Sequence, residues 1–357
     1  MIHLRARKRL GAFDWNVEFI AARGVTVLFG ASGAGKTVTL EAIAGFLRPD
    51  AGRILVGDTL WYDGESGLCL PPQRRHCGYV FQNYALFPHL TLRQNLEYAV
   101  QHLPRLERRR RVNDLLERFK LTTAAERRPA LLSGGQKQRC SIARALISGP
   151  RALLLDEPAR GLDAPLRADL YEVIRQVQAE FAAPVLVVTH DLEECFALGE
   201  EMIVLHEGRV AQMGAPAVVL DRPATLEVAR LIGRHNLIAA EIVHLDPQRD
   251  RSLLRTASGE IASRYYPGHL KGDRVTLCVR TDRVVAHPGP EPPAGGALPV
   301  RLERTVARPQ GTRLEFTDGW AVESRDPRPP AAQNQEQWWL EVPGDAIHLL
   351  PRGESPC

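Results

Sequence analysis

The chain contains 357 residues, a length that predicts two or three compact domains, each large enough to bury a hydrophobic core. Hydrophobic residues make up 44% and charged residues 25%, so the composition is that of a globular protein and excludes the disordered and fibrous classes. The net charge of +4 arises from 46 basic and 42 acidic residues, an excess too small to require nucleic acid as a partner or to exclude it.

Neither a secretory signal nor a membrane anchor is expected. The N-terminal stretch "MIHLRARKRLGAF" is positively charged, but no apolar core follows it. The longest apolar runs, such as "PVLVVT" at 184–189, have the length of a strand and fall short of a bilayer span. We therefore expect a chain that does not itself cross a membrane.

The cysteines show neither a CxxC pair nor the spacing of metal ligands. This pattern predicts small, buried, reduced thiols in a cytosolic protein. The six positions are Cys69, Cys77, Cys140, Cys195, Cys278 and Cys357.

The first two thirds of the chain alternate short β-branched runs with helical stretches, which is typical of a mostly parallel sheet covered by helices. Strands are predicted at 25–29, 78–81, 152–155, 184–188 and 202–206, with a helix over 35–46. Three further helices are predicted at 92–103, 108–120 and 134–148. A helical insert at about 84–150 therefore interrupts an α/β domain.

Four consecutive arginines, Arg108 to Arg111, fall inside the insert. They could contact nucleic acid or lipid head groups. The following turns carry acidic and apolar residues in amphipathic order, which favours a solvated helix face instead.

The character of the sequence changes after "ARLIGRHN" at 229–236. Short alternating runs at 237–243, 274–280, 300–307, 312–323 and 338–342 are separated by turn residues and predict a separate small, barrel-like β domain. Two Pro- and Gly-rich stretches within it, 287–299 and 325–337, are expected to be loops.

The motif "GASGAGKT" fits the phosphate-binding pattern G-x-x-x-x-G-K-[ST] in full, between a predicted strand and a predicted helix. The glycines let backbone N–H groups surround a phosphate, Lys36 reaches the β- and γ-phosphates, and the Thr37 hydroxyl can bind Mg²⁺. The residues of this loop are Gly30, Ala31, Ser32, Gly33, Ala34, Gly35, Lys36 and Thr37.

A carboxylate is needed to complete such a magnesium site, and "ALLLDEP" at 152–158 supplies one after an apolar strand. Asp156 is predicted to hold Mg²⁺, usually through water. Glu157 is placed to accept a proton from the attacking water.

Three smaller features fall where the same site needs them. Gln82 follows the strand at 78–81, and its amide could touch metal and water. His190 follows another strand and can reach a γ-phosphate oxygen, while Asp163 comes just after Glu157. Taken singly, each also fits a structural reading: a turn glutamine, a capping histidine and an N-terminal helix aspartate.

The stretch "LLSGGQKQR" at 131–139 predicts a second helix start with free backbone amides. Ser133 is a natural N-cap, and Gly134 and Gly135 leave the first-turn N–H groups uncovered. Spacing alone leaves two options open, because the helix could face this chain's own nucleotide or one held by another copy.

The ordered set "GASGAGKT", Gln82, "LSGGQ", "LLLDEP", "GLD" and "TH" resembles the nucleotide-binding subunit of ATP-binding cassette (ABC) transporters over about residues 1–235. The resemblance implies a P-loop NTPase cassette of the α/β class, with a helical subdomain at about 84–150. Residues 236–357 would then be a β-rich regulatory domain of the TOBE or OB-like kind.

The resemblance also implies a head-to-tail dimer that shares ATP and Mg²⁺. Glu157, His190 and Gln82 would act in catalysis, and Thr37, Gln82 and Asp156 would hold the metal. Phe13, with Trp15 behind it, is the candidate to stack on adenine. The residues implied to contact the partner's nucleotide are Ser133, Gly134, Gly135, Gln136 and Asp163.

Within that family the chain is most similar to the ATPases of molybdate importers. Iron, sulfate, thiosulfate and polyamine importers share "FQNYALFPHLT" closely. Such a subunit is implied to sit on the cytoplasmic face of the inner membrane, with permease subunits and, indirectly, a periplasmic binding protein as partners and no nucleic acid. The segment 83–90 is the expected docking surface, its structural alternative being the core of the insert.

One departure stands out, because related proteins usually have a small residue two positions before "LD", where this chain has Arg160. The arginine at this position bears on contacts at the dimer interface.

Two other functions remain as alternatives. One is a non-transport ABC ATPase acting on nucleic acid or ribosomes, and the other is a regulatory protein whose β domain senses a small ligand.

Overall fold

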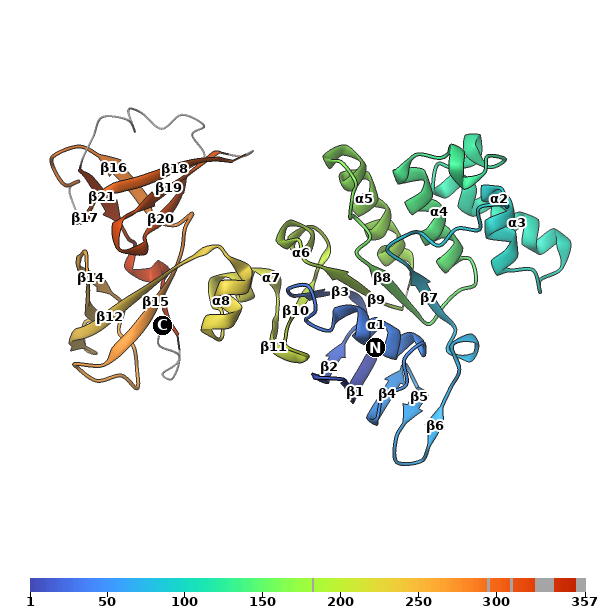
Figure 1. Cartoon of the computed structure of the whole chain (residues 1–357), viewed down its shortest axis with the longest axis horizontal. Helices are drawn as coiled ribbons and strands as arrows, with labels where there is room; N and C mark the ends of the chain where they lie inside the picture. Colours follow the sequence, from blue (N-terminus) through green and yellow to red (C-terminus); the bar gives the residue numbers. More distant parts are fainter. Residues whose placement is uncertain (182, 294–295, 309–310, 325–336, 351–357) are drawn as a thin grey trace. The chain divides into compact units, whose positions relative to one another are not determined.

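The computed structural model describes residues 1–181, 183–293, 296–308, 311–324 and 337–350, and the chain forms two compact units (Figure 1). Unit 1 spans Met1–Ala217 and unit 2 spans Val218–Cys357. This division comes earlier than the boundary after residue 235 that the sequence suggests. The reason is packing, because Leu226 and Ala229 lie in one buried cluster with Cys278 and Leu350 of the C-terminal strands.

A six-stranded sheet organises unit 1. Its strand order is β11 (Arg209–Gly214), β10 (Glu201–His206), β3 (Gly24–Phe29), β9 (Pro184–Thr189), β8 (Ala152–Asp156) and β7 (Cys77–Val80). All neighbours are parallel except β10 and β11. Every residue of β8 and β9 is buried, as expected for strands covered on both faces. The strands predicted from apolar runs are confirmed here.

The first four helices of unit 1 fall close to their predicted positions, and the two after them were not predicted. The helices are α1 (Lys36–Ala44), α2 (Leu92–Ala99), α3 (Arg105–Arg118), α4 (Gly134–Leu146), α5 (Ala164–Glu180) and α6 (Leu192–Leu198), with single 3-10 turns at Pro72–Arg74, Thr122–Ala124 and Pro129–Leu131. Helices α2, α3 and α4 gather as one group in Figure 1, and α4 also contacts β7 and α5.

The arginine run lies on the outer face of α3. Val112 and Leu116 are the buried residues of this helix. Arg111 pairs with Glu107 at 2.7 Å one turn earlier, and both side chains are about 45% exposed. The arginines therefore lie on an exposed helix face, and the choice between a solvated face and a contact surface stays a prediction.

A second sheet of unit 1 is absent from the predictions. It is antiparallel, with the order β2 (Phe13–Ala21), β1 (Ile2–Leu10), β4 (Ala51–Val56), β5 (Thr59–Asp63) and β6 (Leu68–Cys69). Alternate residues of β2 are buried, beginning with Trp15 and Val17. These side chains share one hydrophobic core with Leu154 and Leu186 of the parallel sheet, so the second sheet supports the first.

Unit 2 begins with α7 (Pro216–Asp221), which crosses its border, and α8 (Leu226–Ile232), and continues as strands. Its largest sheet has the order β14 (Gly259–Ser263), β13 (Arg251–Thr256), β12 (His235–Asp246), β15 (Arg274–Arg280) and β22 (Ile347–Leu349). Two three-stranded sheets follow: β16 (Val285–Pro288), β21 (Trp338–Glu341) and β17 (Leu298–Val300), then β18 (Leu302–Arg308), β19 (Gly311–Phe316) and β20 (Ala321–Ser324). Short 3-10 turns lie at Thr317–Gly319 and Gly344–Ala346.

The sheets of unit 2 share a single core that contains Phe316, Trp320 and Trp338. The small C-terminal β domain predicted from the alternating runs is thus present. Of the two Pro-rich stretches, 325–336 lies outside the described residues, and 287–299 is partly described, its ends belonging to β16 and β17.

Five cysteines are free thiols, of which Cys140, Cys195 and Cys278 are buried, while Cys357 lies outside the described residues. Burial raises the pKa of the Cys140 thiol to about 12, so it stays protonated.

Within the described parts of the chain, none of the helices has the length and apolar character needed to span a membrane.

Candidate active site

The phosphate loop lies between β3 and α1, at the edge where the parallel strands end. Gly35 has φ +101°, a left-handed conformation that favours glycine. A Cβ on Gly30 would lie 2.4 Å from the Leu205 carbonyl oxygen, so only glycine fits there. The loop curls around Lys36, whose Nζ donates to the carbonyl oxygens of Gly30 at 2.8 Å and Ala31 at 2.7 Å.

Lys36 is therefore a buried ammonium held by neutral carbonyl groups. Its burial lowers the pKa of the amine, and the nearby carboxylates of Glu157 and Asp156 oppose that effect. A buried cation without a close anionic partner is costly. An anion entering the loop would relieve this cost, and the first N–H groups of α1 would contact the same anion.

Asp156, the last residue of β8, lies beside the loop and is 7% exposed. Its Oδ1 accepts from Thr37 Oγ1 at 3.3 Å, and its Oδ2 accepts from Tyr79 Oη at 3.3 Å. Burial raises the pKa of Asp156, although the two hydrogen bonds act in the opposite direction. Thr37 and Asp156, both predicted to hold Mg²⁺, thus lie in contact with each other. Tyr79 was missed because a tyrosine inside an apolar strand is expected to be a core residue.

Glu157 follows directly in a left-handed conformation, with φ +45°, and its N–H donates to the Val188 carbonyl at 3.0 Å. Three side chains surround its carboxylate. Gln82 Nε2 lies 3.3 Å from Oε2, and His190 Nδ1 lies 3.2 Å from Oε1. Arg160 Nη1 makes the shortest contact, 2.8 Å to Oε2.

The structure thus brings together Gln82, Glu157 and His190, which the sequence placed only by their positions after three strands. Each follows a strand of the same parallel sheet, so all lie at its carboxyl edge. Because an ionised carboxylate only accepts hydrogen bonds, the His190 Nδ1 carries the proton in this contact.

A further arginine, Arg167 of α5, joins two loops of this edge. Its Nη1 donates to Asp191 Oδ2 at 2.9 Å, and its Nη2 donates to the Leu162 carbonyl at 3.4 Å. Asp191 follows His190 and caps α6, while Leu162 precedes Asp163. No sequence motif pointed to Arg167, because its main partner, Asp191, lies 24 residues further along the chain.

Asp163 is the N-cap of α5, and its Oδ1 accepts from the Leu166 N–H at 3.0 Å. Asp163 thus has the structural role of an N-terminal helix aspartate that the sequence allowed. This role is that of the separate subunit, and the contact of Asp163 with a partner's nucleotide stays a prediction.

The stretch at 131–139 starts α4 through a capping box. Ser133 Oγ accepts from the Gln136 N–H at 3.2 Å, and Gln136 Oε1 accepts from the Ser133 N–H at 3.1 Å. Gly135 packs against α5, because a Cβ there would lie 2.9 Å from Leu166 Cδ2. Among the described residues, no hydrogen bond joins 133–136 to the phosphate loop at 30–37.

The two aromatic candidates for adenine stacking differ in exposure. The Phe13 ring is half-buried and lies next to the phosphate loop, since a Cβ on Gly35 would be 3.3 Å from Phe13 Cζ. Trp15 is fully buried and donates from Nε1 to Thr39 Oγ1 at 3.1 Å. Trp15 is therefore a core residue, and the prediction that it is the second candidate to stack on adenine is wrong.

The segment 83–90 is partly buried and tied to the insert. The Phe87 ring lies 4.7 Å from that of Tyr98, and the Arg144 guanidinium lies 5.4 Å from its centroid. The fully buried Asn95 accepts from the Phe87 N–H at 2.9 Å. Pro88 and His89 remain exposed, so the segment combines a packed base with an accessible tip.

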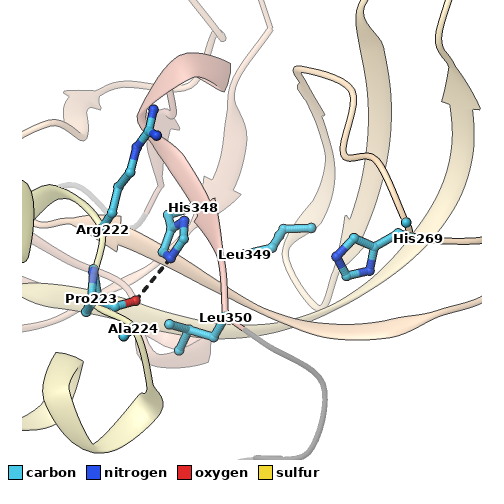
Figure 2. A pocket seen from close by; sticks show the side chains of 8 residues that line it. Arg222, Pro223, Ala224, His269, His348, Leu349 and Leu350 are labelled. Carbon is cyan, nitrogen blue, oxygen red and sulfur yellow. Dashed lines mark hydrogen bonds between the residues drawn. The ribbon is translucent and has the colours of Figure 1, made fainter. Parts of the chain in front are cut away.

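Unit 2 contains a separate pocket of about 470 Å³ (Figure 2). Arg222, His269 and His348 line it with apolar neighbours, and His348 Nε2 donates to the Pro223 carbonyl at 3.1 Å. Burial lowers the pKa of His348. In the described part of the chain, no group of three or more His, Cys, Asp or Glu side chains has the arrangement of a metal site.

The parallel sheet, its phosphate loop and the carboxylates at its edge define a P-loop ATPase cassette. The ABC transporter family matches residues 16–160. The chain is 39% identical over 264 residues to the molybdenum import ATP-binding protein ModC of Rhodospirillum rubrum, covering 74% of this chain and 71% of that protein. It belongs to the ABC transporter family, as an ATP-hydrolysing subunit of the import type.

Three further comparisons agree. The molybdate/tungstate import ATP-binding protein WtpC of Archaeoglobus fulgidus is 42% identical over 237 residues, covering 66% of this chain and 96% of the relative. Spermidine/putrescine import ATP-binding proteins are similar as well. Among solved structures, the ATP-binding cassette MJ0796, dimeric and bound to ADP and Pi after hydrolysis, is 27% identical with a TM-score of 0.52, covering 60% of this chain and 99% of that one.

Proposed function

We propose that the chain energises the import of an oxyanion such as molybdate, working as a head-to-tail homodimer on the cytoplasmic face of the inner membrane. The observation that carries the proposal is the cluster of Lys36, Asp156 and Glu157 at one sheet edge, which is suited to ATP hydrolysis. The signature at 133–136 starts a different helix and is available to a second copy.

In this proposal the phosphate loop, Gly30 to Thr37, binds the chain's own ATP. The Lys36 ammonium exchanges the carbonyls of Gly30 and Ala31 for phosphate oxygens. Phe13, beside the loop, stacks on the adenine ring. The buried position of the lysine strengthens its contact with an anion, because little water screens the two charges.

Thr37 and Asp156, whose side chains lie 3.3 Å apart, are proposed to hold Mg²⁺. The carboxylate is largely desolvated, and a divalent cation would favour its ionised form. The Thr37 hydroxyl, the Asp156 carboxylate and the Gln82 amide oxygen are oxygen ligands of the kind that Mg²⁺ prefers. When bound, the ion would neutralise charge on the β- and γ-phosphates.

Glu157 is proposed as the general base that accepts a proton from the attacking water. Its backbone N–H is fixed to β9, so the carboxylate starts from a defined position. His190 holds Oε1 through Nδ1, and only a protonated imidazole ring could also donate from Nε2 to a γ-phosphate oxygen.

The second phosphate contact is proposed to come from the partner copy, through Ser133, Gly134, Gly135, Gln136 and Asp163. The capping box satisfies the Gln136 N–H, and the first two N–H groups of α4 have no acceptor within the helix. They can therefore bind a γ-phosphate. ATP would hold two copies together, and loss of the γ-phosphate would release them.

The test of the catalytic proposal is Glu157→Gln in the full chain. We expect phosphate release to fall at least 100-fold, ATP binding to persist, and a dimer to accumulate with ATP in size-exclusion chromatography with light scattering. Turnover at the wild-type rate would remove Glu157 from this role. Ser133→Ala should slow turnover while the monomer still binds ATP, and equal loss of monomer binding would contradict a contact made in trans.

The remaining parts of the importer follow from the same proposal. Residues 83–90 would contact the permease through their exposed tip, next to the loop that carries Gln82. Residues 236–357 would form a regulatory domain. A periplasmic binding protein would deliver the solute, and nucleic acid would play no part.

The solute proposal rests on the two molybdate-related relatives. Its test is the ATPase rate of the chain reconstituted with the permease and binding protein encoded beside it. We expect molybdate to raise the rate several-fold, with sulfate and spermidine as comparison solutes. Stimulation by spermidine alone would assign the chain to polyamine import.

A further inference from the structure

Arg160 lies on the short turn between β8 and α5, three residues after Glu157. The turn is closed by a hydrogen bond from the Arg160 N–H to the Glu157 carbonyl at 3.2 Å. The left-handed backbone of Glu157 and this bond bring the two side chains to the same side. The guanidinium thus lies directly on the carboxylate, 2.8 Å from Nη1 to Oε2.

The carboxylate of Glu157 is surrounded by donors in the separate subunit. Oε2 accepts from both Gln82 Nε2 and Arg160 Nη1, while Oε1 meets His190 Nδ1. Arg160 is the closest of the three and the one that is always charged. A general base needs a free lone pair, and the bound guanidinium occupies one of those on Oε2.

The two side chains differ in how easily they can move. The Glu157 side chain is 16% exposed, whereas that of Arg160 is 58% exposed. Arg160 reaches the carboxylate from the solvent side and can therefore leave without disturbing the core. Gly161, Leu162 and Asp163 come next in the chain, so a partner that contacts Asp163 would act on the same turn.

We propose that Arg160 is a positioning residue that restrains the Glu157 carboxylate in the separate subunit, so that rapid hydrolysis requires the guanidinium to move away. The inference rests on the proposed role of Glu157 as the base. It makes pairing of two copies a condition for fast turnover, through a residue that lies outside the phosphate loop and the signature.

The experiment compares ATP turnover of full-length Arg160→Ser with wild type, at low protein concentration and without membrane partners. We expect kcat to rise about two- to tenfold with KM for ATP unchanged, a size in keeping with one partly exposed ion pair. Arg160→Lys should give a smaller rise, because the ammonium keeps the charge without the guanidinium's reach.

Arg175→Ser is the matched control. Arg175 pairs with Glu172 at 2.9 Å with the same three-residue spacing, and its side chain is 51% exposed. Loss of this pair should leave kcat at the wild-type value. Melting temperatures of all variants would show that each one folds.

An unchanged or lower kcat in Arg160→Ser would overturn the proposal. A large fall at constant KM would instead mean that Arg160 supports the transition state. The double variant Glu157→Gln with Arg160→Ser should stay as inactive as Glu157→Gln, and restored turnover would show that Arg160 acts elsewhere. If Glu157→Gln alone kept wild-type turnover, the proposed function would fail first, whatever Arg160→Ser did.

Discussion

Glu194, on the first turn of α6, gives a prediction about stability that can be worked out from its surroundings. The residue is 2% exposed, and its Oε1 has no hydrogen-bond partner among the described residues. Burial raises its pKa to about 7, and a hydrogen bond from Thr189 only partly offsets this effect. An ionised Glu194 is thus costly in the folded state.

The sign and size of the effect follow from linkage. In the folded state the carboxyl holds its proton up to about pH 7, while in the unfolded chain it releases it near 4.5. Between these values the folded state binds more protons, so the free energy of unfolding falls as pH rises. The difference between about 7 and 4.5 corresponds to roughly 3 kcal/mol of lost stability above pH 7.

Glu194→Gln removes the titration but keeps the shape of the side chain. Relative to wild type, we expect this variant to gain about 3 kcal/mol of stability between pH 5 and pH 8. Urea unfolding at several pH values would measure this gain in the free energy of unfolding. Hydrogen exchange of peptides from β9 and α6 would show that the gain includes the segments around Glu194.

Glu193→Gln is the control, because it makes the same substitution at the neighbouring residue of α6, whose side chain is exposed. A difference between Glu194→Gln and wild type that stays constant from pH 5 to pH 8 would refute the reasoning.

Two further predictions concern the nucleotide site. Phe13→Ala should raise KM for ATP several-fold. Trp15→Phe should leave KM unchanged and cost about 2–3 kcal/mol of stability, since it removes the hydrogen bond to Thr39 and leaves a cavity in the core. The opposite pattern in ATP titrations and urea unfolding would reverse the two assignments. Gly135→Ala should leave the free energy of unfolding within about 1 kcal/mol of wild type, because the Leu166 Cδ2 that its Cβ meets at 2.9 Å is the end of a flexible, half-exposed side chain and alanine favours the helix; a loss of more than about 2 kcal/mol in urea unfolding would show that Leu166 cannot move.

The part of the site that lies next to strand ends could be predicted from sequence. The phosphate loop and the Asp156–Glu157 pair each follow a buried apolar strand, and parallel strands end at one edge. Gln82 and His190 follow from the same rule. Their mutual contacts, however, depend on rotamers and on the left-handed turn at Glu157, which no periodicity encodes.

The features that were missed depend on contacts between distant segments. The antiparallel sheet of β1 and β2 alternates buried and exposed residues, but its charged outer face hid the pattern in a short N-terminal stretch. Trp15 is buried because that sheet packs over α1, where Thr39 accepts its N–H. The boundary between the units lies after residue 217, earlier than the sequence suggests, because α8 packs on strands that come much later in the chain.

The signature helix shows why spacing alone could not decide whose phosphate it holds. Its start is defined locally by Ser133, but its position is set by Tyr84, whose carbonyl accepts from Ser141 Oγ at 2.9 Å and from Arg144 Nη2 at 3.4 Å. Tyr84 has a left-handed backbone, with φ +64°, and lies two residues after Gln82. The loop that carries Gln82 is therefore joined to α4 through the carbonyl of Tyr84, a contact between distant segments that spacing alone does not encode.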